Sequence, residues 1–465
     1  MVFLLAGTLQ VQGTEAAACF AEPTQDCAFD LAFETADRQT NPQAWAQGLL
    51  ALAAAQESAG SDHAEQTLSH LLDNIETRLP EPGKLIWALG FDAVFKPDQE
   101  KLFAEAPVAA GRLAAFMLEY RIGLETEPRL KATAIAIAYL AFAGTPDRAM
   151  AVIEESESEI RAVLAPGAAR FFIRDRDIGS AWRFVDYVLD SMPKGAERDK
   201  RLIPLAYTLS EEGYFDAVAI LASTMHRTKY SVEAQGQVAW QLFVRGRVLE
   251  ARRMIADMKQ RYPRRLEPGP ASLIMAFGKE GDGGTQNADP SGRYDKYKAI
   301  AAITTGDLDR AFDYLRAHGA ADYAFAATLN TLVSAYVRSG QIDLSPFFEQ
   351  IPREHLAGGL SVLGKWQAEL GDLDGSWRSF AEALTHGAGH PGSFNSRFFA
   401  LERLLLERGD AGEALRLAHD LEDSKALARL AAMMGASPAQ MAFWGCVQPG
   451  FGGRLPVLGT SWDCF

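Results

Sequence analysis

Residues 306–315 read GDLDRAFDYL, and residues 371–380 read GDLDGSWRSF. In both stretches a glycine and an aspartate precede a segment with apolar residues at helical spacing. A glycine can end a helix in the left-handed conformation without the steric penalty of a Cβ atom. An aspartate before a helix accepts hydrogen bonds from the free amide groups of its first turn. The repeated stretch therefore predicts the turn, or elbow, between the two helices of a helical hairpin. Each hairpin needs one such elbow.

Similar elbows recur along the chain, and each is closed by a small residue that opens the second helix. They occupy residues 60–64, 144–149, 176–181, 213–217, 246–251, 306–311, 340–345, 371–376 and 409–414. The closing residues at 149, 181, 217 and 251 are separated by 32, 36 and 34 residues. A period near 34 residues is typical of a helical repeat array, here of about ten hairpins. The flanking segments place apolar residues at i, i+3 and i+4, which predicts amphipathic helices and an all-α fold.

The segment 360–384 resembles the tetratricopeptide-repeat family. The matching positions are the Leu-Gly pair Leu363 and Gly364, the turn Gly371 and Asp372, and the small, aromatic and small positions Ser376, Phe380 and Ala383. The preceding repeat has Leu332, Tyr336 and Gly340 in register, and the period extends over residues 42–435, although the Trp and Pro positions of the family are mostly absent. The resemblance implies a right-handed α-solenoid that presents a concave surface to a partner. Members of the family share no common activity, so the fold by itself does not identify a function.

Two segments interrupt the repeats and suggest the domain organisation. Residues 278–292, GKEGDGGTQNADPSG, are rich in Gly, Asp and Asn and predict a flexible loop or linker. This linker would separate an N-terminal helical array, residues 22–277, from a C-terminal array, residues 293–435. The tail, residues 436–465, has no helical period and is predicted to be an irregular cap that covers the end of the array.

The N-terminal residues 1–21 are interpreted as a signal peptide. A short apolar stretch at residues 2–9 precedes the small residues Ala16, Ala17 and Ala18, which favours cleavage after Ala18 or after Ala21. No Lys or Arg precedes Arg38, so the basic region usual at the start of such a peptide is absent. The sequence thus predicts a periplasmic or secreted protein of the cell envelope.

Cysteine usage supports export. The four cysteines are Cys19, Cys27, Cys446 and Cys464, in one close pair near each end of the chain. Close pairs with no cysteine between them are typical of local disulfides formed in an oxidising compartment. We therefore predict Cys19–Cys27 and Cys446–Cys464, so that both irregular ends are tied by short disulfide loops. Lipidation of Cys19 and unpaired thiols are the alternatives.

The charge and hydropathy of the chain exclude some partners. A net charge of −14 over 465 residues disfavours nucleic-acid binding, which requires a basic face. The same charge favours a partner with a basic patch, mainly through the association rate. No run of eighteen apolar residues follows the N-terminus, so no membrane-spanning segment is expected in the mature chain.

No motif in the sequence indicates catalysis, a cofactor or a metal. His386 and His390 in HGAGH, and His63 and His70 on one predicted helix, have no neighbouring ligand cluster and are interpreted as loop and surface residues. The acidic loop at residues 282–289 lacks the spacing and the closing Glu of an EF-hand. The phosphate-loop pattern GxxxxGK[ST], the nucleophile elbow GxSxG and the zinc motif HExxH do not occur. No catalytic, cofactor-binding or metal-binding residue is predicted.

The functional prediction is a non-enzymatic protein–protein interaction scaffold or assembly factor that binds another envelope protein. Trp182, Tyr187 and Trp377, on predicted second helices, are the candidate partner-binding aromatics, and packing between repeats is the alternative role for them. The alternative function is an enzyme, or a protein that binds a small ligand or a glycan, with the helical array as the substrate cradle.

Overall fold

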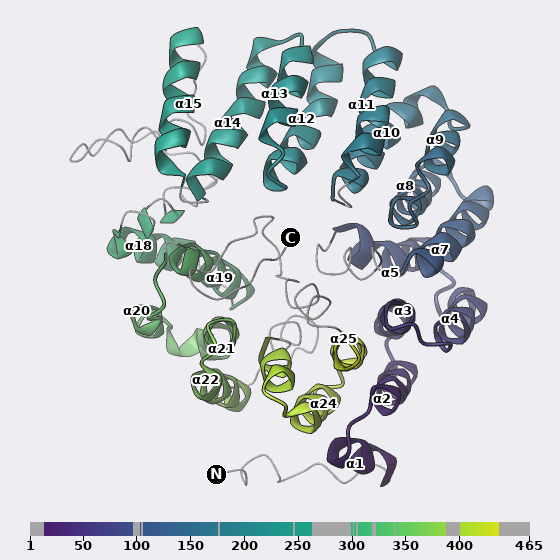
Figure 1. The fold of residues 1–465 in the computed structure, drawn as a ribbon, viewed down its shortest axis with the longest axis vertical. Helices are drawn as coiled ribbons and strands as arrows, with labels where there is room; N and C mark the ends of the chain where they lie inside the picture. Colours follow the sequence, from purple (N-terminus) through teal and green to yellow (C-terminus); the bar gives the residue numbers. More distant parts are fainter. Residues whose placement is uncertain are drawn as a thin grey trace.

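The protein is described by a computed structural model that covers residues 14–95, 103, 106–174, 177–244, 247–262, 299–300, 302–303, 306–318, 322–338, 340–386 and 400–436. Every regular element in these ranges is helical, which confirms the predicted all-α class. The helices follow one another around a ring (Figure 1). The predicted linker at 278–292, the tail at 437–465 and the pair Cys446–Cys464 lie outside the described residues.

The helices of the first half of the chain are α1 (Thr14–Ala21), α2 (Gln25–Asp37), α3 (Pro42–Ser58), α4 (Ala64–Arg78), α5 (Pro82–Phe95), α7 (Pro107–Tyr120), α8 (Thr126–Phe142), α9 (Pro146–Glu154), α10 (Ser158–Arg174), α11 (Ile178–Ser191), α12 (Ala196–Glu211), α13 (Phe215–Thr224), α14 (Thr228–Val244) and α15 (Val248–Arg261). Those of the second half are α18 (Leu308–His318), α19 (Asp322–Arg338), α20 (Ser345–Phe348), α21 (Leu356–Glu369), α22 (Leu373–Thr385), α24 (Ala411–Asp420) and α25 (Ser424–Met434).

Seven of the nine predicted elbows have their glycine in the left-handed conformation that the sequence predicts, and Arg176 and Gly246 of the other two lie outside the described residues. Seven glycines at the predicted elbows, namely Gly60, Gly144, Gly213, Gly306, Gly340, Gly371 and Gly409, have φ values between +63° and +90°. In GDLDGSWRSF, the Asp372 carboxylate accepts a hydrogen bond from the amide of Gly375 at 2.9 Å and caps α22. The closing small residue is buried in most elbows, as at Ala149 and Ala251. Ser345 is exposed instead, because the second helix there is only the four-residue α20.

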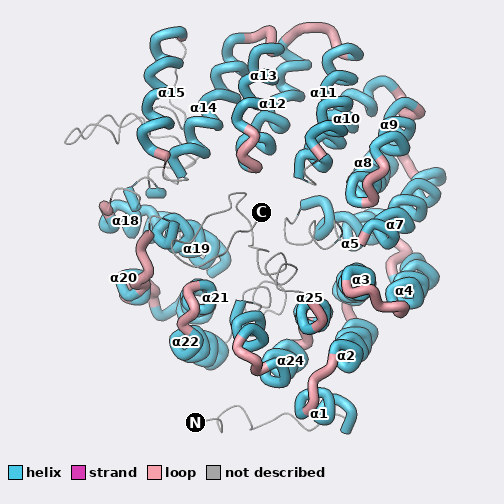
Figure 2. The backbone as a smooth tube through the Cα atoms, in the orientation of Figure 1, coloured by secondary structure: helices cyan, strands magenta, loops and turns pink. Residues whose placement is uncertain are grey.

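The helices stack in two layers (Figure 2). The first-helix layer consists of α3, α5, α8, α10, α12 and α14, and each of these helices contacts the next. The second helices, such as α4, α9, α11, α13 and α15, pack against their own first helix. Helices in the first-helix layer therefore have neighbours on several sides. As a result residues 45–56 of α3 are all buried, although the helix has no single apolar stripe.

The two ends of the array pack against each other. Helix α25 contacts α2 and α3, and α24 contacts α1 (Figure 1). The Gln25 side chain donates a hydrogen bond to the carbonyl of Ala431 at 3.0 Å, and the Lys425 ammonium donates one to Gln47 at 2.8 Å. The main apolar cluster is continuous through this contact and includes side chains from both ends of the chain. The terminal helices thus cover each other, a closure that the sequence did not predict.

The closure depends on a close approach at Gly412. A Cβ atom at this position would lie 2.1 Å from the backbone oxygen of Phe20 in α1. We expect Gly412→Ala to lower the free energy of unfolding by about 1–3 kcal/mol, because backbone atoms must move to relieve the clash. Gly236→Ala is the matched control, because its Cβ would meet no atom within 4 Å and alanine favours a helix. Denaturant unfolding measures both, and hydrogen exchange in α1 and α24 reports the opening. Equal stability of the two variants would contradict the close approach.

A buried carboxyl lies next to the closure, in the helical residues 400–407. Glu402 is completely buried, and neither of its carboxylate oxygens has a hydrogen-bond partner among the described residues. Burial raises the pKa of Glu402 well above its ordinary value, and the nearby Asp423 raises it further, while Arg429 lowers it. The neutral acid is therefore the form that the fold favours.

Glu402→Gln is expected to stabilise the protein at neutral and higher pH, by about 1–3 kcal/mol, because it removes the cost of burying a charge. The pKa of Glu402 is higher in the folded state than in the unfolded state. The wild type therefore keeps its full stability below the unfolded-state pKa. It loses stability as the pH rises from the unfolded-state pKa toward the folded-state pKa. The difference between variant and wild type should therefore vanish near about pH 4. Urea unfolding at neutral pH and at about pH 4 measures this difference in stability. A variant that is less stable at high pH would show that the ionised carboxylate stabilises the fold.

Candidate partner-binding groove

A groove with a volume of about 740 Å³ crosses three neighbouring helices of the first-helix layer. We call it the α8–α10–α12 groove. Its lining residues are Leu130, Lys131, Ala134 and Ile137 of α8, Val163, Leu164, Pro166, Gly167, Ala168, Arg170, Phe171 and Arg174 of α10, and Glu197, Lys200, Arg201 and Pro204 of α12. Each of the three helices packs against the helix that follows it, α9, α11 or α13, so three adjacent helical hairpins build the groove.

The floor of the groove is apolar. Leu130, Ala134 and Ile137 are spaced at i, i+4 and i+7, which places them on one face of α8. Phe171 of α10 is 9% exposed, while Val163 of the same helix is 38% exposed and is one of the few large apolar side chains on the surface. A ligand with an apolar side chain could therefore remove Val163 from water without disturbing the core.

Two helix-interior prolines also line the groove, Pro166 in α10 and Pro204 in α12. A proline has no amide hydrogen, so it cannot donate the helical bond to the carbonyl four residues earlier. The carbonyls of Ala162 and Lys200 therefore lack that bond. Of these two residues, Lys200 lines the groove, while Ala162 is not among the lining residues.

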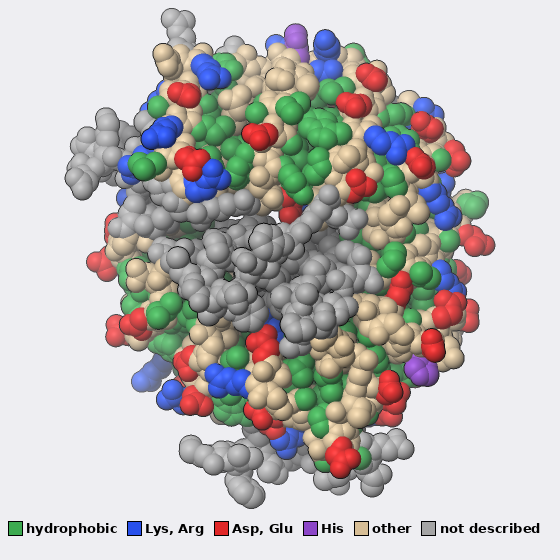
Figure 3. All heavy atoms as spheres, viewed as in Figure 1, with side chains coloured by type: hydrophobic (Ala, Val, Ile, Leu, Met, Phe, Trp, Pro, Cys, Tyr) green, Lys and Arg blue, Asp and Glu red, His purple; other side chains and the backbone are tan. Residues whose placement is uncertain are grey.

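The rim of the groove is cationic. Five of the lining side chains are positively charged, Lys131, Arg170, Arg174, Lys200 and Arg201, and one is negative, Glu197. In contrast, acidic and basic side chains are interspersed over the face of the molecule seen in Figure 3. The groove therefore has a charge opposite in sign to the net charge of −14 of the chain.

Carboxylates around the groove compensate part of this charge. Lys131 is 2.8 Å from Glu127, and Arg201 is 3.2 Å from Glu197. Both pairs are exposed to solvent, and such pairs are worth about 0–1 kcal/mol, so an incoming carboxylate can replace either of them.

Burial raises the pKa of Glu211, while the charges of Arg174 and Arg170 lower it. The two arginines thus lie close enough to this carboxyl to act on it.

The predicted aromatic residues lie elsewhere. Trp182 and Tyr187 are half-buried on α11, and Trp377 is half-buried on α22. All three are in the second-helix layer and pack against the main apolar cluster, and none of them lines the groove. The structure does not bring Trp377 together with the two residues of α11.

The histidines also have structural partners. His63 lies 3.3 Å from the side chain of Gln66, and His386 ends α22. His390 and the acidic loop at residues 282–289 lie outside the described residues. Within the described part of the chain, no group of three or more His, Cys, Asp or Glu residues could hold a metal ion.

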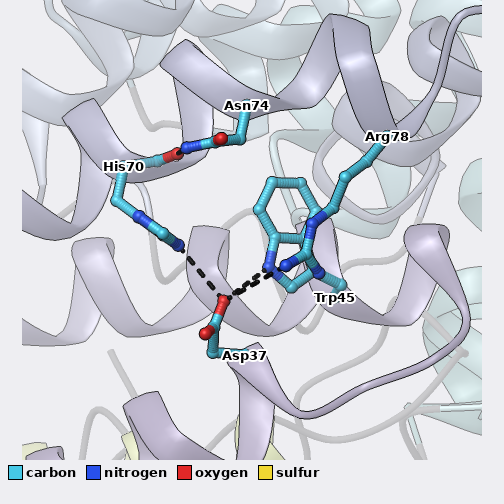
Figure 4. Close-up of polar contacts among 5 residues, drawn as sticks. All are labelled: Asp37, Trp45, His70, Asn74 and Arg78. Carbon is cyan, nitrogen blue, oxygen red and sulfur yellow. Dashed lines mark hydrogen bonds and ion pairs between the residues drawn. The ribbon is translucent and has the colours of Figure 1, made fainter.

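His70 belongs to a polar cluster that joins three helices (Figure 4). Asp37, the last residue of α2, receives a hydrogen bond from the indole nitrogen of Trp45 at 3.1 Å and lies 3.2 Å from His70 Nε2. The Arg78 guanidinium lies 3.6 Å from the same carboxylate oxygen and 4.3 Å from the centre of the Trp45 ring. Asn74 donates a hydrogen bond to the carbonyl of His70 at 2.8 Å. The cluster links α2, α3 and α4, so a structural role explains these residues.

The cysteine prediction is confirmed where the chain is described. Cys19 and Cys27 form a disulfide with a Cα–Cα distance of 5.7 Å, between α1 and α2. The described helices include none that is both long enough and apolar enough to cross a membrane.

In the comparison with known proteins, no family model and no curated protein matches the chain. The groove is therefore interpreted from its own geometry. Sequence reasoning missed it because its cations are far apart in the chain. The signal that could have found it is the presence of one or two cations in each of three successive first helices, near the start of α8 and α12 and near the end of α10.

Proposed function

We propose that the protein is a non-enzymatic interaction scaffold or assembly factor of the bacterial periplasm or cell envelope, which binds another protein. The observation that carries the proposal is the α8–α10–α12 groove, whose apolar floor and cationic rim lie on a layer formed by successive repeats. Repeat arrays of this kind bind partners through extended, preformed surfaces with a few buried anchors. The right-handed, tetratricopeptide-like arrangement expected from the sequence is part of the same proposal.

The location in the envelope is supported by the Cys19–Cys27 disulfide, because such bonds persist in oxidising compartments. Cys19 is 5% exposed and, while it is paired, has no thiol for lipidation. Of the two expected cleavage points, only the one after Ala18 leaves Cys19 in the mature chain. Alkylation and mass measurement of protein isolated from the native host test both the cleavage point and the pairing of Cys19 with Cys27. Free thiols at Cys19 and Cys27 would contradict the proposed compartment.

The binding function is tested by photo-crosslinking in the native host. A photoreactive amino acid replaces Lys200 at the rim of the groove in one variant and Arg148, an exposed residue of α9 outside the groove, in another. We expect the first variant to capture one envelope protein in stoichiometric yield and the second to capture none. If no protein is captured from either position, nor by general crosslinkers, the scaffold function is wrong.

A second function, binding of a small molecule, has one observation in its favour. The volume of about 740 Å³ lies within the range of small-molecule sites, which is roughly 300–1,000 Å³. Native mass spectrometry of protein purified from the host distinguishes the two functions. A bound species of low mass, together with the absence of a crosslinked protein, would favour the small ligand.

A further inference from the structure

We propose that the α8–α10–α12 groove binds a short extended segment of the partner protein in which acidic side chains flank an apolar anchor. The proposal rests on the proposed function and specifies the chemistry of the partner. It departs from what the net charge of −14 alone suggests, namely a partner with a basic patch.

The length of the segment follows from the spacing of the helices. Helix α10 lies between α8 and α12 and contacts both. Packed helices are about 8–10 Å apart, so the groove crosses two spacings, or about 16–20 Å. An extended chain covers about 3.3–3.6 Å per residue, so five or six residues cross the groove.

The positions of the charges follow from the flanking helices. Lys131 of α8 and Lys200 of α12 are both exposed, on opposite sides of α10. A carboxylate near each end of the segment would therefore meet a lysine. Arg170 and Arg174 lie on the central helix and add positive potential between them. Because water screens exposed pairs, these contacts mainly set the orientation and the association rate of the segment.

The centre of the segment is specified by the floor. Leu130, Val163 and Phe171 supply apolar side chains to the lining of the same groove. An apolar anchor of the size of leucine or phenylalanine would lie on it and bury Val163.

Other polyanions suit this groove less well. A nucleic acid or an anionic membrane surface presents negative charge over a wide area, and the rest of the chain would repel it because of its net charge. A single short segment meets only the local charge of the groove. An anionic glycan would meet the same lysines, but it has no apolar anchor for Val163.

The experiment selects peptides from a random library of eight-residue sequences on the full, disulfide-intact protein. Three forms are compared: the wild type, the double variant Lys131→Glu/Lys200→Glu, and the control Arg148→Glu, which reverses a charge outside the groove. All three positions are exposed, and unfolding curves confirm that each form is folded. We expect wild type and control to enrich peptides with Asp or Glu on both sides of an apolar residue.

The double variant should lose affinity for the enriched acidic peptide by about tenfold or more, and should itself enrich peptides with Lys or Arg at the same positions. Selection of basic peptides by the wild type, an unchanged preference in the double variant, or no enrichment at all would each overturn the proposal. Crosslinking in cells separates this result from failure of the proposed function. If the double variant still captures the partner in full yield, the scaffold function stands and the assignment of the groove is wrong.

Discussion

Arg403→Ala is expected to lower the free energy of unfolding by about 3–5 kcal/mol, because it leaves a carboxylate buried without its counter-charge. The Arg403 side chain is 7% exposed and lies 2.9 Å from Glu369 and 3.4 Å from Glu407. Glu369 is the last residue of α21, so the ion pair joins this hairpin to the following helical residues 400–407. Urea unfolding at neutral pH measures the loss.

The triple variant Arg403→Met/Glu369→Met/Glu407→Met is the control for this prediction, because Arg403 pairs with both carboxylates. Replacing all members of a buried ionic group by apolar residues of similar size is often nearly neutral, so the triple variant should cost much less than Arg403→Ala alone. If Arg403→Ala costs less than about 1 kcal/mol, the pair behaves like an exposed one and the burial argument fails.

Trp45→Ala has the second large expected effect, a loss of about 3–5 kcal/mol in the free energy of unfolding. Trp45 is completely buried in α3, and the substitution leaves a cavity between α2, α3 and α4. It also removes the indole hydrogen bond to Asp37 and the ring beneath the Arg78 guanidinium. Chemical unfolding measures the loss.

Trp45→Phe separates packing from polar contacts, because it keeps an aromatic ring but no indole N–H. Burial raises the pKa of Asp37, but the hydrogen bonds from Trp45 and His70 and the charges of His70 and Arg78 outweigh it, so the pKa is lowered. In Trp45→Phe the pKa of Asp37 should therefore rise, which NMR titration of this carboxyl measures. The stability loss should be well below that of Trp45→Ala, and equal losses would show that the hydrogen bond, not the packing, dominates.

The elbows were predictable from sequence because their cause is local. Gly371 and Asp372 need only their neighbours in the sequence to form a turn and a helix cap. The recurrence of such pairs at a period of about 34 residues identifies the other elbows. The Cys19–Cys27 disulfide was predictable for the same reason, because the two cysteines are only eight positions apart in the sequence.

The ring closure and the groove were not predictable in the same way. Gln25 and Ala431 are 406 residues apart, and neither shows a pattern that identifies the other. Lys131, Arg170 and Lys200 each look like an ordinary surface cation of an amphipathic helix. They form one rim only because three hairpins stack in parallel. The candidate partner-binding aromatics, such as Trp182, lie on second helices and pack against the main apolar cluster.

The contact of α25 with α2 and α3 changes how the array can unfold. In an open array each terminal repeat has one neighbour, so unfolding starts at the ends and proceeds inward at low cost. In this chain the first and last repeats hold each other, and neither can separate alone without breaking a contact between segments about 400 residues apart. We expect slow folding, because that contact requires closure of nearly the whole chain. Among the described helices, neither end of the array opens to a protease until this contact breaks.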